Sequence, residues 1–404
     1  MADNPLNERP LTVVLVHNRY QRPGGEDVAV EADAALLAAH GHRVVRFERD
    51  NDDIDAMGAF GRARLAAGTL WSLSSARAVS ALLRDVEPDV VHVHNTFPMI
   101  SASIYSSAAK RRVPVVQTLH NYRLVCAAAV CAREGHKCEE CVGRSVPWPA
   151  VRHACYHDSR TQSAVVAGAQ MLHHVLGTWD RRVSLFLAVS QHTADALIGA
   201  GALPSDRVMV RYNFCDPDPG WRGPGADAGH VLFAGRLERE KGVFELVSAA
   251  ARVPAVRVLI AGDGAARDQA EKLARQLDAT NISFLGQVSR DEVLDRLRQA
   301  RCLVFPSIWD EPFPMVLVEA SALGVPTVAS AVGGVPEIVS DDTGMLVPPG
   351  DVGRLASALS AAAADPAGWQ AKGERARRRY EEAFTADQAY ATLLGAYRRA
   401  GVRN

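Results

Sequence analysis

Residues 230–253 read HVLFAGRLEREKGVFELVSAAARV, and this stretch contains a complete strand–loop–helix unit. Its first residues form a near-continuous apolar run, which is typical of a parallel strand that is covered on both faces. Gly235 ends that run, and Lys241 and Gly242 lie where the following helix is expected to start. The stretch therefore predicts an α/β fold in which the strand-to-helix loops carry the charged residues.

The same alternation of apolar runs and amphipathic stretches continues along the whole chain. Capping boxes mark two of the helix starts, one at Ser289 with Glu292 and the other at Thr385 with Gln388. Strands that alternate with helices predict parallel, doubly wound sheets. The strand candidates are 11–18, 42–48, 89–95, 113–121, 184–190 and 207–213 in the first half, and 230–236, 256–264, 281–288, 301–307, 325–332 and 343–350 in the second.

A stretch rich in Pro, Gly and Asp, residues 213–229, separates the two sets of strands and is interpreted as a linker. The expected organisation is an N-terminal Rossmann-like domain over 1–212, a C-terminal Rossmann-like domain over 230–384, and a C-terminal helix over 385–404. We expect that helix to pack back toward the N-terminal domain. Two such domains that face each other would bind a ligand between the carboxyl ends of their strands.

The bulk composition excludes several classes of protein. The 404 residues are 48% hydrophobic and 23% charged, with a formal net charge of −1, which argues against a general nucleic-acid binder. The N-terminal residues MADNPLNERP are polar and do not resemble a signal peptide, and no apolar run is long enough to cross a bilayer. We expect a cytoplasmic protein.

Two glycine-bounded loops are suited to binding phosphate. Arg236 and Lys241, beside the N–H groups at a helix start, would form a diphosphate site. The alternative is that these side chains are solvated charges paired with nearby glutamates. Gly24 and Gly25, after the first strand, would let backbone amides approach a phosphate. Neither loop matches the GxGxxG or Walker A pattern.

The stretch DEPFPMVLVEA, residues 310–320, carries a pair of glutamates that could serve acid/base chemistry or bind a polar ligand. A helix is predicted to begin near Pro314 and to end before Gly324 and Pro326. At helical rise, Glu311 and Glu319 would be up to roughly 12 Å apart, beyond the spacing of about 5–9.5 Å expected in glycoside hydrolases. This spacing favours ligand binding.

Several motifs, taken together, resemble the retaining glycosyltransferases of family 4, which have the two-domain GT-B fold. In the second half these are GRLEREKG, EPFPMVLVE as Glu-x7-Glu, AVGGVPEIV and TGMLVPPGD, in that order. In the first half PGGEDV, DVVHVHNTFP and TLHNYRL are similar to the family but less distinctive. The resemblance implies a retaining hexosyltransferase that moves a sugar from a UDP- or GDP-sugar to a hydroxyl acceptor, without a catalytic cofactor.

The resemblance also implies roles for individual residues. Arg236 and Lys241 would neutralise the departing diphosphate, Glu311 would contact the donor sugar, and Glu319 would bind the ribose. His120 matches the family's histidine near the transferred sugar, so the implied catalytic set is His120, Arg236, Lys241 and Glu311. The implied donor-binding set is Gly24, Gly25, Gly235, Arg236, Lys241, Gly262, Gly286, Ser307, Glu311, Phe313, Pro314, Met315, Val316 and Glu319.

Three histidines lie near strand ends, and the chain departs from the family pattern at two positions. His120 ends its strand, which favours a functional role, whereas His92 and His94 share one face of a strand and are expected to pack in the core. Many family members have glycine where this chain has Pro314, and His-Asp where it has His120-Asn121. The second departure removes a carboxylate at that point.

Five cysteines fall between Cys126 and Cys155, and without a secretory signal a disulfide framework is disfavoured. The Cys-x2-Cys knuckle of Cys138 and Cys141, with one cysteine on each side, fits a structural zinc site. The candidate zinc ligands are Cys126, Cys138, Cys141 and Cys155. The alternative is a set of thiols in a loop insert, 126–155, with nearby histidines as other ligands.

Basic and apolar residues mix in 58–85, which allows peripheral contact with the inner face of the membrane. A solvated helix face over the core is the other explanation. Two functions besides transfer also remain open: a sugar-nucleotide 2-epimerase of the same fold, and a zinc-stabilised protein that binds a sugar nucleotide without turnover.

Overall fold

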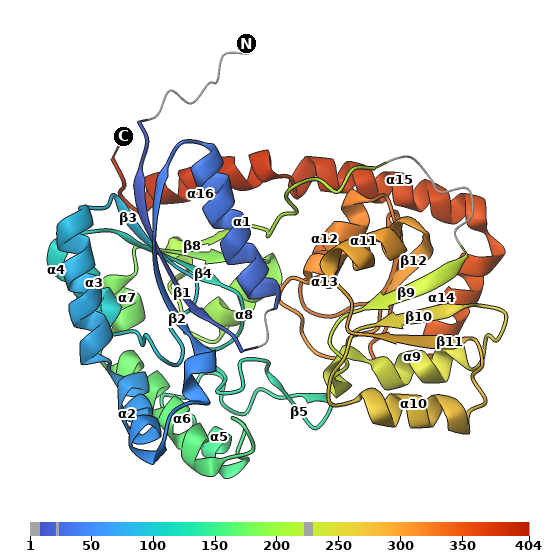
Figure 1. Cartoon of the computed structure of the whole chain (residues 1–404), viewed down its shortest axis with the longest axis horizontal. Coiled ribbons are helices and arrows are strands. Elements are labelled where there is room, and N and C mark those ends of the chain that lie inside the picture. The colour runs from blue at the N-terminus through green and yellow to red at the C-terminus, as the bar shows by residue number, and fades with distance from the viewer. Residues whose placement is uncertain (1–8, 22–23, 222–228, 404) are drawn as a thin grey trace. The chain divides into compact units, whose positions relative to one another are not determined.

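The computed structural model describes residues 9–21, 24–221 and 229–403, which form two compact units (Figure 1). The first unit comprises the chain up to Val130, Glu139–Arg211 and the residues from Ala389 onward. The second comprises Cys131–Cys138 and Tyr212–Gln388. Most of the N-terminal stretch MADNPLNERP, and residues 222–228 of the expected linker, lie outside the described residues.

The first unit is built on a six-stranded parallel sheet in the order β2-β1-β3-β4-β7-β8. The four central strands, β1, β3, β4 and β7, are apolar and mostly buried, so helices cover both faces of the sheet. The predicted strands of the first half are thereby confirmed. Their bounds are β1 Thr12–Arg19, β2 Arg43–Asp50, β3 Val90–Val93, β4 Val115–Leu119, β7 Leu185–Ala188 and β8 Val208–Val210.

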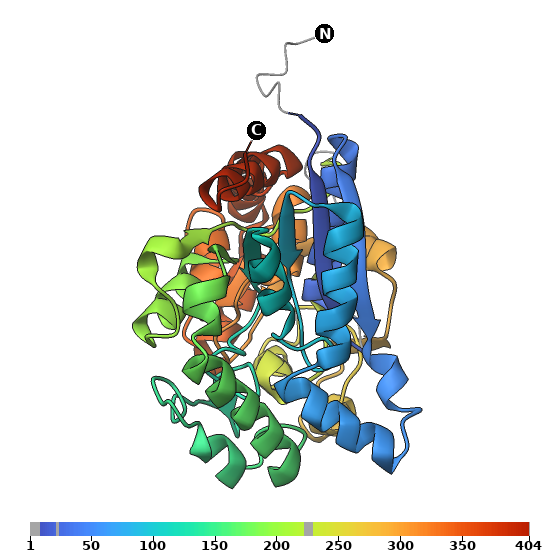
Figure 2. The same cartoon turned by 90° about the vertical axis from the view of Figure 1, so that its left-hand side faces the viewer.

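Helices alternate with these strands along the first unit. Serine caps start three of them, since Ser72, Ser159 and Ser190 each accept a hydrogen bond from a backbone N–H of the first helical turn. Figure 2 shows α6 in green beside α2 in blue, and the two helices pack together. The helices are α1 Gly25–Ala39, α2 Ala59–Leu70, α3 Leu73–Val86, α4 Ile104–Arg111, α5 Trp148–Arg152, α6 Arg160–Val175, α7 Thr178–Arg182 and α8 Gln191–Gly199, with 3-10 turns η1 Asn51–Ile54 and η2 Ser205–Arg207.

The second unit has its own six-stranded parallel sheet, in the order β11-β10-β9-β12-β13-β14. Chain order reverses between β9 and β12, so this sheet has the doubly wound strand order of a Rossmann fold. The predicted strands of the second half are also confirmed. Their bounds are β9 His230–Ala234, β10 Val258–Ala261, β11 Ile282–Gly286, β12 Ala300–Phe305, β13 Thr327–Ser330 and β14 Gly344–Val347.

The helices of the second unit follow its strands. Ser289 caps α11 as predicted, by accepting a hydrogen bond from the Glu292 N–H. The helix predicted near Pro314 is α12, with Pro314 as its N-cap residue and Met315 as its first helical residue. The helices are α9 Val243–Ala250, α10 Arg267–Gln276, α11 Arg290–Arg298, α12 Met315–Ala322, α13 Val335–Ile338, α14 Val352–Ala364 and α15 Pro366–Ala383, with the 3-10 turn η3 Arg239–Lys241.

The sequence prediction missed a short antiparallel hairpin inside the cysteine-rich insert. Its strands are β5 Ala132–Arg133 and β6 His136–Lys137. Lys137 Nζ lies 3.2 Å from Asp310 Oδ2, within the second unit. The insert 126–155 is therefore divided, because its hairpin belongs to the second unit and its remainder to the first.

The C-terminal helix α16, Ala386–Arg399, supplies core residues to the first unit from Ala389 onward. Leu393, Leu394 and Tyr397 pack with strand residues of the first sheet in one buried cluster. Tyr397 also shares a hydrogen bond with His92, and the hydroxyl of Tyr390 lies 2.7 Å from Nε2 of His42. The last residues of the chain are thus an integral part of the first unit.

Candidate functional site

The candidate site of the second unit lies at the point where its strand order reverses. Ligands of doubly wound sheets bind at the carboxyl ends of the strands beside such a reversal. The loop after β9 carries Gly235, Arg236 and Lys241, and the loop after β12 carries Ser307 and Glu311. Lys241 and Glu311, which are 70 positions apart in the sequence, are thereby brought into direct contact.

Glu311 is the centre of this contact. Its Oε1 atom accepts hydrogen bonds from Lys241 Nζ at 2.6 Å, from Ser307 Oγ at 2.8 Å and from Trp309 Nε1 at 2.7 Å. The Glu311 residue is 4% exposed, and the Lys241 ammonium group also lies over the Trp309 ring, 5.2 Å from its centroid. A buried carboxylate with an ammonium partner and two further donors is held in one orientation.

Two glycines allow these loops to come close enough. Gly242 adopts a φ of +74°, and a Cβ atom there would lie 1.8 Å from the carbonyl oxygen of Pro306. A Cβ on Gly333 would lie 2.2 Å from the carbonyl oxygen of Glu311. Backbone hydrogen bonds complete the link, from Ile308 N to Glu240 O and from Gly334 N to Glu311 O. The site is therefore fixed by backbone packing as well as by side chains.

The predicted backbone positions at the ends of β9, β10 and β11 are neighbours. The Gly262 N–H donates to the Gly286 carbonyl at 2.8 Å, and a Cβ on Gly262 would lie 1.9 Å from the Gly235 carbonyl oxygen. Arg236 follows Gly235 and is exposed. The structure thus brings an exposed guanidinium, the Lys241 ammonium group and close-packed backbone to one edge of this sheet.

Helix α12 carries the second predicted glutamate. Glu319 is 7% exposed, and its Oε1 accepts a hydrogen bond from Arg290 Nε at 2.7 Å. The sequence prediction missed Arg290, the first residue of α11, and it also missed Trp309. No spacing pattern links Arg290 to Glu319, and Trp309, two residues before Glu311 in the same loop, lies outside the recognised motif. Of the predicted neighbours at the start of α12, Pro314, Met315 and Val316 are half-buried.

Phe313 was predicted to bind the donor, but its side chain packs in an aromatic cluster. Its ring stacks on Tyr212, with centroids 5.3 Å apart, and meets Phe384 edge-on at 5.7 Å. The residue is 6% exposed. The phenyl ring therefore packs within the second unit, and the donor contact of Phe313 stays a prediction.

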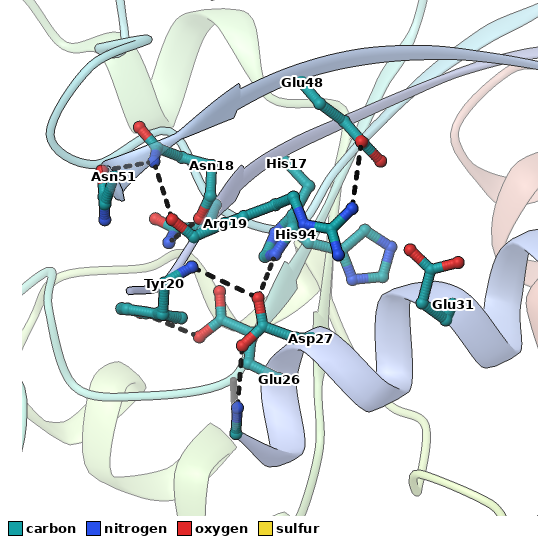
Figure 3. A network of polar contacts seen from close by, with 12 residues as sticks. His17, Asn18, Arg19, Tyr20, Glu26, Asp27, Glu31, Glu48, Asn51 and His94 are labelled. Atoms are coloured by element: carbon teal, nitrogen blue, oxygen red, sulfur yellow. Dashed lines mark hydrogen bonds and ion pairs between the residues drawn. The ribbon is translucent and has the colours of Figure 1, made fainter. Parts of the chain in front are cut away.

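In the first unit, the glycine loop that precedes α1 is held by Asp27 (Figure 3). The Asp27 carboxylate accepts hydrogen bonds from Gly24 N at 2.9 Å and Tyr20 N at 3.3 Å, and it lies 3.0 Å from His17 Nε2. These contacts lower the pKa of Asp27, against the opposing effect of burial, which is the larger single influence. Because the Gly24 amide is engaged, the amide of Gly25 is the one that could face a phosphate.

Another carboxyl group lies beside Asn121, although position 121 itself lacks the carboxylate of the family pattern. Glu26 Oε2 accepts hydrogen bonds from Asn121 Nδ2 at 3.2 Å and from the Tyr20 hydroxyl at 3.1 Å. Burial raises the pKa of Glu26 to about 7, although both hydrogen bonds and the nearby His17 act in the opposite direction. Glu26 thus places a carboxyl group with a raised pKa beside Asn121, the residue that follows His120.

His120 follows β4 and contacts a second histidine. Its Nε2 atom lies 2.9 Å from His94 Nδ1, and the two rings stack with centroids 5.2 Å apart. Burial lowers the pKa of His120 to about 3 and that of His94 well below its ordinary value. His92 packs in the core as expected, between the Tyr397 and Thr118 hydroxyls. His94 is buried too, but its contact with His120 goes beyond packing.

A pocket within the first unit is lined by His94, His120 and Asn121, together with Asn95 and Arg123. The Arg123 guanidinium lies over the Phe97 ring, 4.5 Å from the centroid. The other lining residues include apolar side chains, and such a mixture is the ordinary lining of a site for a small polar molecule.

The four candidate zinc ligands fall in both units. Cys141 and Cys155 pack against one cluster of buried residues, Ala127, Ala150 and Val166, in the first unit, where Cys126 also lies. Cys138 follows β6 in the second unit, and its N–H donates to the Cys131 carbonyl. The zinc site stays a prediction.

Among the described residues, no helix combines the length and the apolar character that a membrane span requires. The expected contact with a membrane surface stays a prediction.

Comparison with known proteins identifies the family of each half. Residues 23–219 match the family model described as Glycosyltransferase Family 4, and residues 224–383 match the one described as Glycosyl transferases group 1. The two matches are adjacent and divide the chain as its two sheets do.

Curated relatives agree with these matches. The chain is 32% identical over 269 residues to a glycogen synthase of Mycobacterium tuberculosis, covering 59% of this chain and 63% of the relative. It is 33% identical over 290 residues to the D-inositol 3-phosphate glycosyltransferase of Mycolicibacterium smegmatis, covering 67% of this chain and 59% of that protein. The chain thus matches about three fifths of the length of these relatives.

Solved structures show the same fold over nearly the whole chain. Sucrose-phosphate synthase from Thermosynechococcus elongatus superimposes with a TM-score of 0.71 at 22% identity, covering 96% of this chain and 98% of that one. Anabaena HepE in complex with UDP superimposes with a TM-score of 0.67 at 20% identity, covering 95% of this chain and 99% of that one.

Two Rossmann-like units with a cationic site at the strand reversal of the second define a GT-B protein. With both family models matched, the chain belongs to the family 4 type of glycosyltransferases.

Proposed function

We propose that this chain is a retaining glycosyltransferase that moves a sugar from a nucleotide-diphosphate donor to a hydroxyl acceptor. The observation that supports this most directly is the contact between Lys241 and Glu311 at the strand reversal of the second unit. A UDP-sugar is the first donor to test, because the solved Anabaena HepE structures were determined with UDP and with UDP-glucose.

In this proposal, Arg236 and Lys241 stabilise the negative charge that develops on the diphosphate as the sugar leaves. Preorganised cations act strongly on charge that appears only in the transition state. The Glu311 carboxylate carries the compensating charge while the donor is absent. With the donor bound, it holds the Lys241 ammonium group in place and contacts sugar hydroxyls.

No enzymic nucleophile is invoked, since retention follows if the acceptor attacks on the face from which the diphosphate leaves. A phosphate oxygen of the donor then takes the acceptor proton, and the anomeric carbon–oxygen bond to the acceptor forms as the bond to the diphosphate breaks. The protein contributes positioning and charge stabilisation. The pocket beside His120 and Asn121 in the first unit is the proposed place of the acceptor hydroxyl.

Calorimetric titration with UDP, GDP, ADP and their glucose or mannose derivatives tests the donor. We expect one nucleotide and its sugar to bind with micromolar affinity, and Lys241→Met to weaken that binding at least tenfold. Lys272→Met, which removes an exposed lysine from α10 in the same unit, is the matched control and should bind normally. Failure of all three nucleotides to bind contradicts the proposal.

The anomeric configuration of the product tests the mechanism. Proton NMR of the newly formed glycoside should show the configuration of the donor. Inversion would refute the retaining mechanism, and interconversion of the sugar nucleotide without an acceptor would indicate an epimerase instead.

A further inference from the structure

A line of buried polar groups runs from His120 into the interior of the first unit. His120 Nε2 lies 2.9 Å from His94 Nδ1. The other ring nitrogen of His94, Nε2, has no hydrogen-bond partner among the described residues, and it lies 3.6 Å from Asp33 Oδ2, beyond hydrogen-bond distance. His94 is 4% exposed and Asp33 is 1% exposed. All three residues belong to one unit, so their spacing is a property of that unit alone.

At the end away from His120, this line meets the fixed positive charge of Arg211. Arg211 donates two hydrogen bonds to Asp33, from Nη2 to Oδ1 at 2.5 Å and from Nη1 to Oδ2 at 3.0 Å, and its Nε donates to the Ala389 carbonyl. A guanidinium group stays protonated in proteins. Asp33 is therefore a carboxylate, which can accept hydrogen bonds but cannot donate them.

The same carboxylate, with His92 and His94, forms a group whose ligand atoms converge as those of a metal site would. Arg211 already neutralises Asp33, however, and His92 is engaged with hydroxyls at both ring nitrogens. A divalent cation there would be placed against a buried guanidinium group. The arrangement is therefore better explained as a row of polar side chains oriented by the charge of Asp33.

The proton positions on the two histidines follow from the charge of Asp33. His94 Nε2 carries its proton, because a bare lone pair 3.6 Å from a buried carboxylate would be repelled electrostatically. His94 is neutral, since burial lowers its pKa, so its Nδ1 has no proton and accepts. The donor in the contact between the two histidines is then the Nε2–H of His120.

We propose that Asp33 and His94 are positioning residues that hold His120 as its Nε2–H tautomer, leaving Nδ1 of His120 to accept a hydrogen bond from a substrate hydroxyl. The hydroxyl partner rests on the proposed function, whereas the tautomer does not. The role is orientation rather than proton storage, because a group with a pKa of about 3 is protonated in only about one molecule in ten thousand at pH 7.

His92 is a comparable histidine that does not belong to this line of polar groups. It is as deeply buried, and its ring lies 4.4 Å from that of His94, but its hydrogen bonds run to Tyr397 and Thr118. A substitution at His92 therefore disturbs the same part of the core without a direct link to His120. His92→Gln is the matched control.

Long-range proton–nitrogen NMR of the full-length protein labelled with ¹⁵N-histidine measures the tautomers without requiring turnover. In the wild type, His120 should show a protonated Nε2 and a bare Nδ1, and His94 should show the same. A wild-type His120 protonated at Nδ1 overturns the proposal, whatever the variants do.

Asp33→Asn tests the cause of the tautomer. The amide oxygen of the new side chain would face Arg211 and its NH₂ group would face His94, so both rings should change to the Nδ1–H form. We expect kcat to fall about 100-fold, with the donor KM changed less than about threefold, because the defect lies in orientation. His92→Gln should leave the His120 tautomer unchanged.

An Asp33→Asn protein that folds and keeps the Nε2–H tautomer would contradict the positioning role. If that variant does not fold, His94→Phe removes the acceptor and should abolish the preference at His120, and a preference that persists contradicts the proposal. The Nε2–H tautomer in a wild type that transfers no sugar would support positioning by Asp33 and His94, but would overturn the proposed function and its substrate hydroxyl.

Discussion

The Nζ atom of Lys241 lies 2.6 Å from Oε1 of Glu311, and this contact joins two loops on either side of the strand reversal in the second unit. The Lys241 side chain is 16% exposed and that of Glu311 is 5% exposed. Two charges at this distance and burial hold each other in position, and the loss of one leaves the other without its main partner.

Lys241→Met should therefore reduce kcat/KM for the donor by about 100- to 1,000-fold, because the charge on the leaving diphosphate loses a preorganised cation. Initial rates at several donor concentrations measure the effect, with Lys272→Met as the control. A loss below about tenfold would show that Lys241 does not act on the leaving group.

Trp309→Phe should destabilise the second unit by about 2 kcal/mol, since Glu311 loses a donated hydrogen bond while the aromatic packing is largely kept. Chemical denaturation measures this free energy of unfolding. Trp148→Phe removes an indole N–H from a residue that is 65% exposed and should change stability by less than about 0.5 kcal/mol. Equal effects would show that the contact with Glu311 adds no stability.

Glu26→Gln should change the pH dependence of stability. The pKa of Glu26 is raised from 4.5 to about 7 by burial, so the folded state retains a proton that the unfolded state loses above pH 4.5. In the wild type this contribution to stability is present below pH 4.5 and is lost as the pH rises to 7. The free energy of unfolding of the variant should therefore increase relative to that of the wild type as the pH rises from 4.5 to 7. The difference should reach up to about 3 kcal/mol at pH 8.

Thermal or urea denaturation at pH 4, 6 and 8 measures this difference in stability between the variant and the wild type. Glu31→Gln, on the same helix, is the control because Arg46 lowers the pKa of Glu31. Any effect of that variant should therefore be a loss of stability at neutral pH. A difference between Glu26→Gln and the wild type that does not vary with pH would exclude the raised pKa.

Protein purified without chelator should contain about one equivalent of zinc, held by Cys126, Cys138, Cys141 and Cys155. Cys141→Ser should lower the zinc content to below a tenth of an equivalent, because thiolate is the ligand that the site needs. Atomic emission analysis measures both proteins, and less than a tenth of an equivalent in the wild type would rule out the site.

Vesicles rich in anionic lipid should sediment the protein at physiological salt, through Phe60, which is 85% exposed, and the exposed Arg62 and Arg64 of the same helix, α2. Phe60→Ser should reduce the bound fraction several-fold. Leu277→Ser, at a 44% exposed leucine of the second unit, should not. If the wild type does not sediment with the vesicles, the predicted membrane contact is ruled out.

The strands of the two sheets could be predicted from the sequence because most of them are near-continuous apolar runs, as expected of parallel strands covered on both faces. The hairpin β5–β6 could not, since each strand has only two residues and His136 and Lys137 are exposed. Its pairing depends on a local turn rather than on burial.

The candidate site was predictable only in part, for a similar reason. Lys241 and Glu311 belong to motifs with recognisable spacing, whereas Arg290 and Trp309 reach the glutamates from loops and helix starts without such a pattern. Asp33 and Arg211 are 178 residues apart and meet only in the folded unit. Contacts of this kind depend on tertiary packing, which periodicity does not encode.

The contribution of α16 to the first unit has a consequence for synthesis on the ribosome. Residues from Ala389 onward are translated after the whole sequence of the second unit, yet Leu393 and Tyr397 fill the core of the first. The second unit can therefore complete its fold while the first still lacks part of its core. Until α16 has been translated, the nascent chain must keep His92 and the neighbouring apolar strands without their final cover.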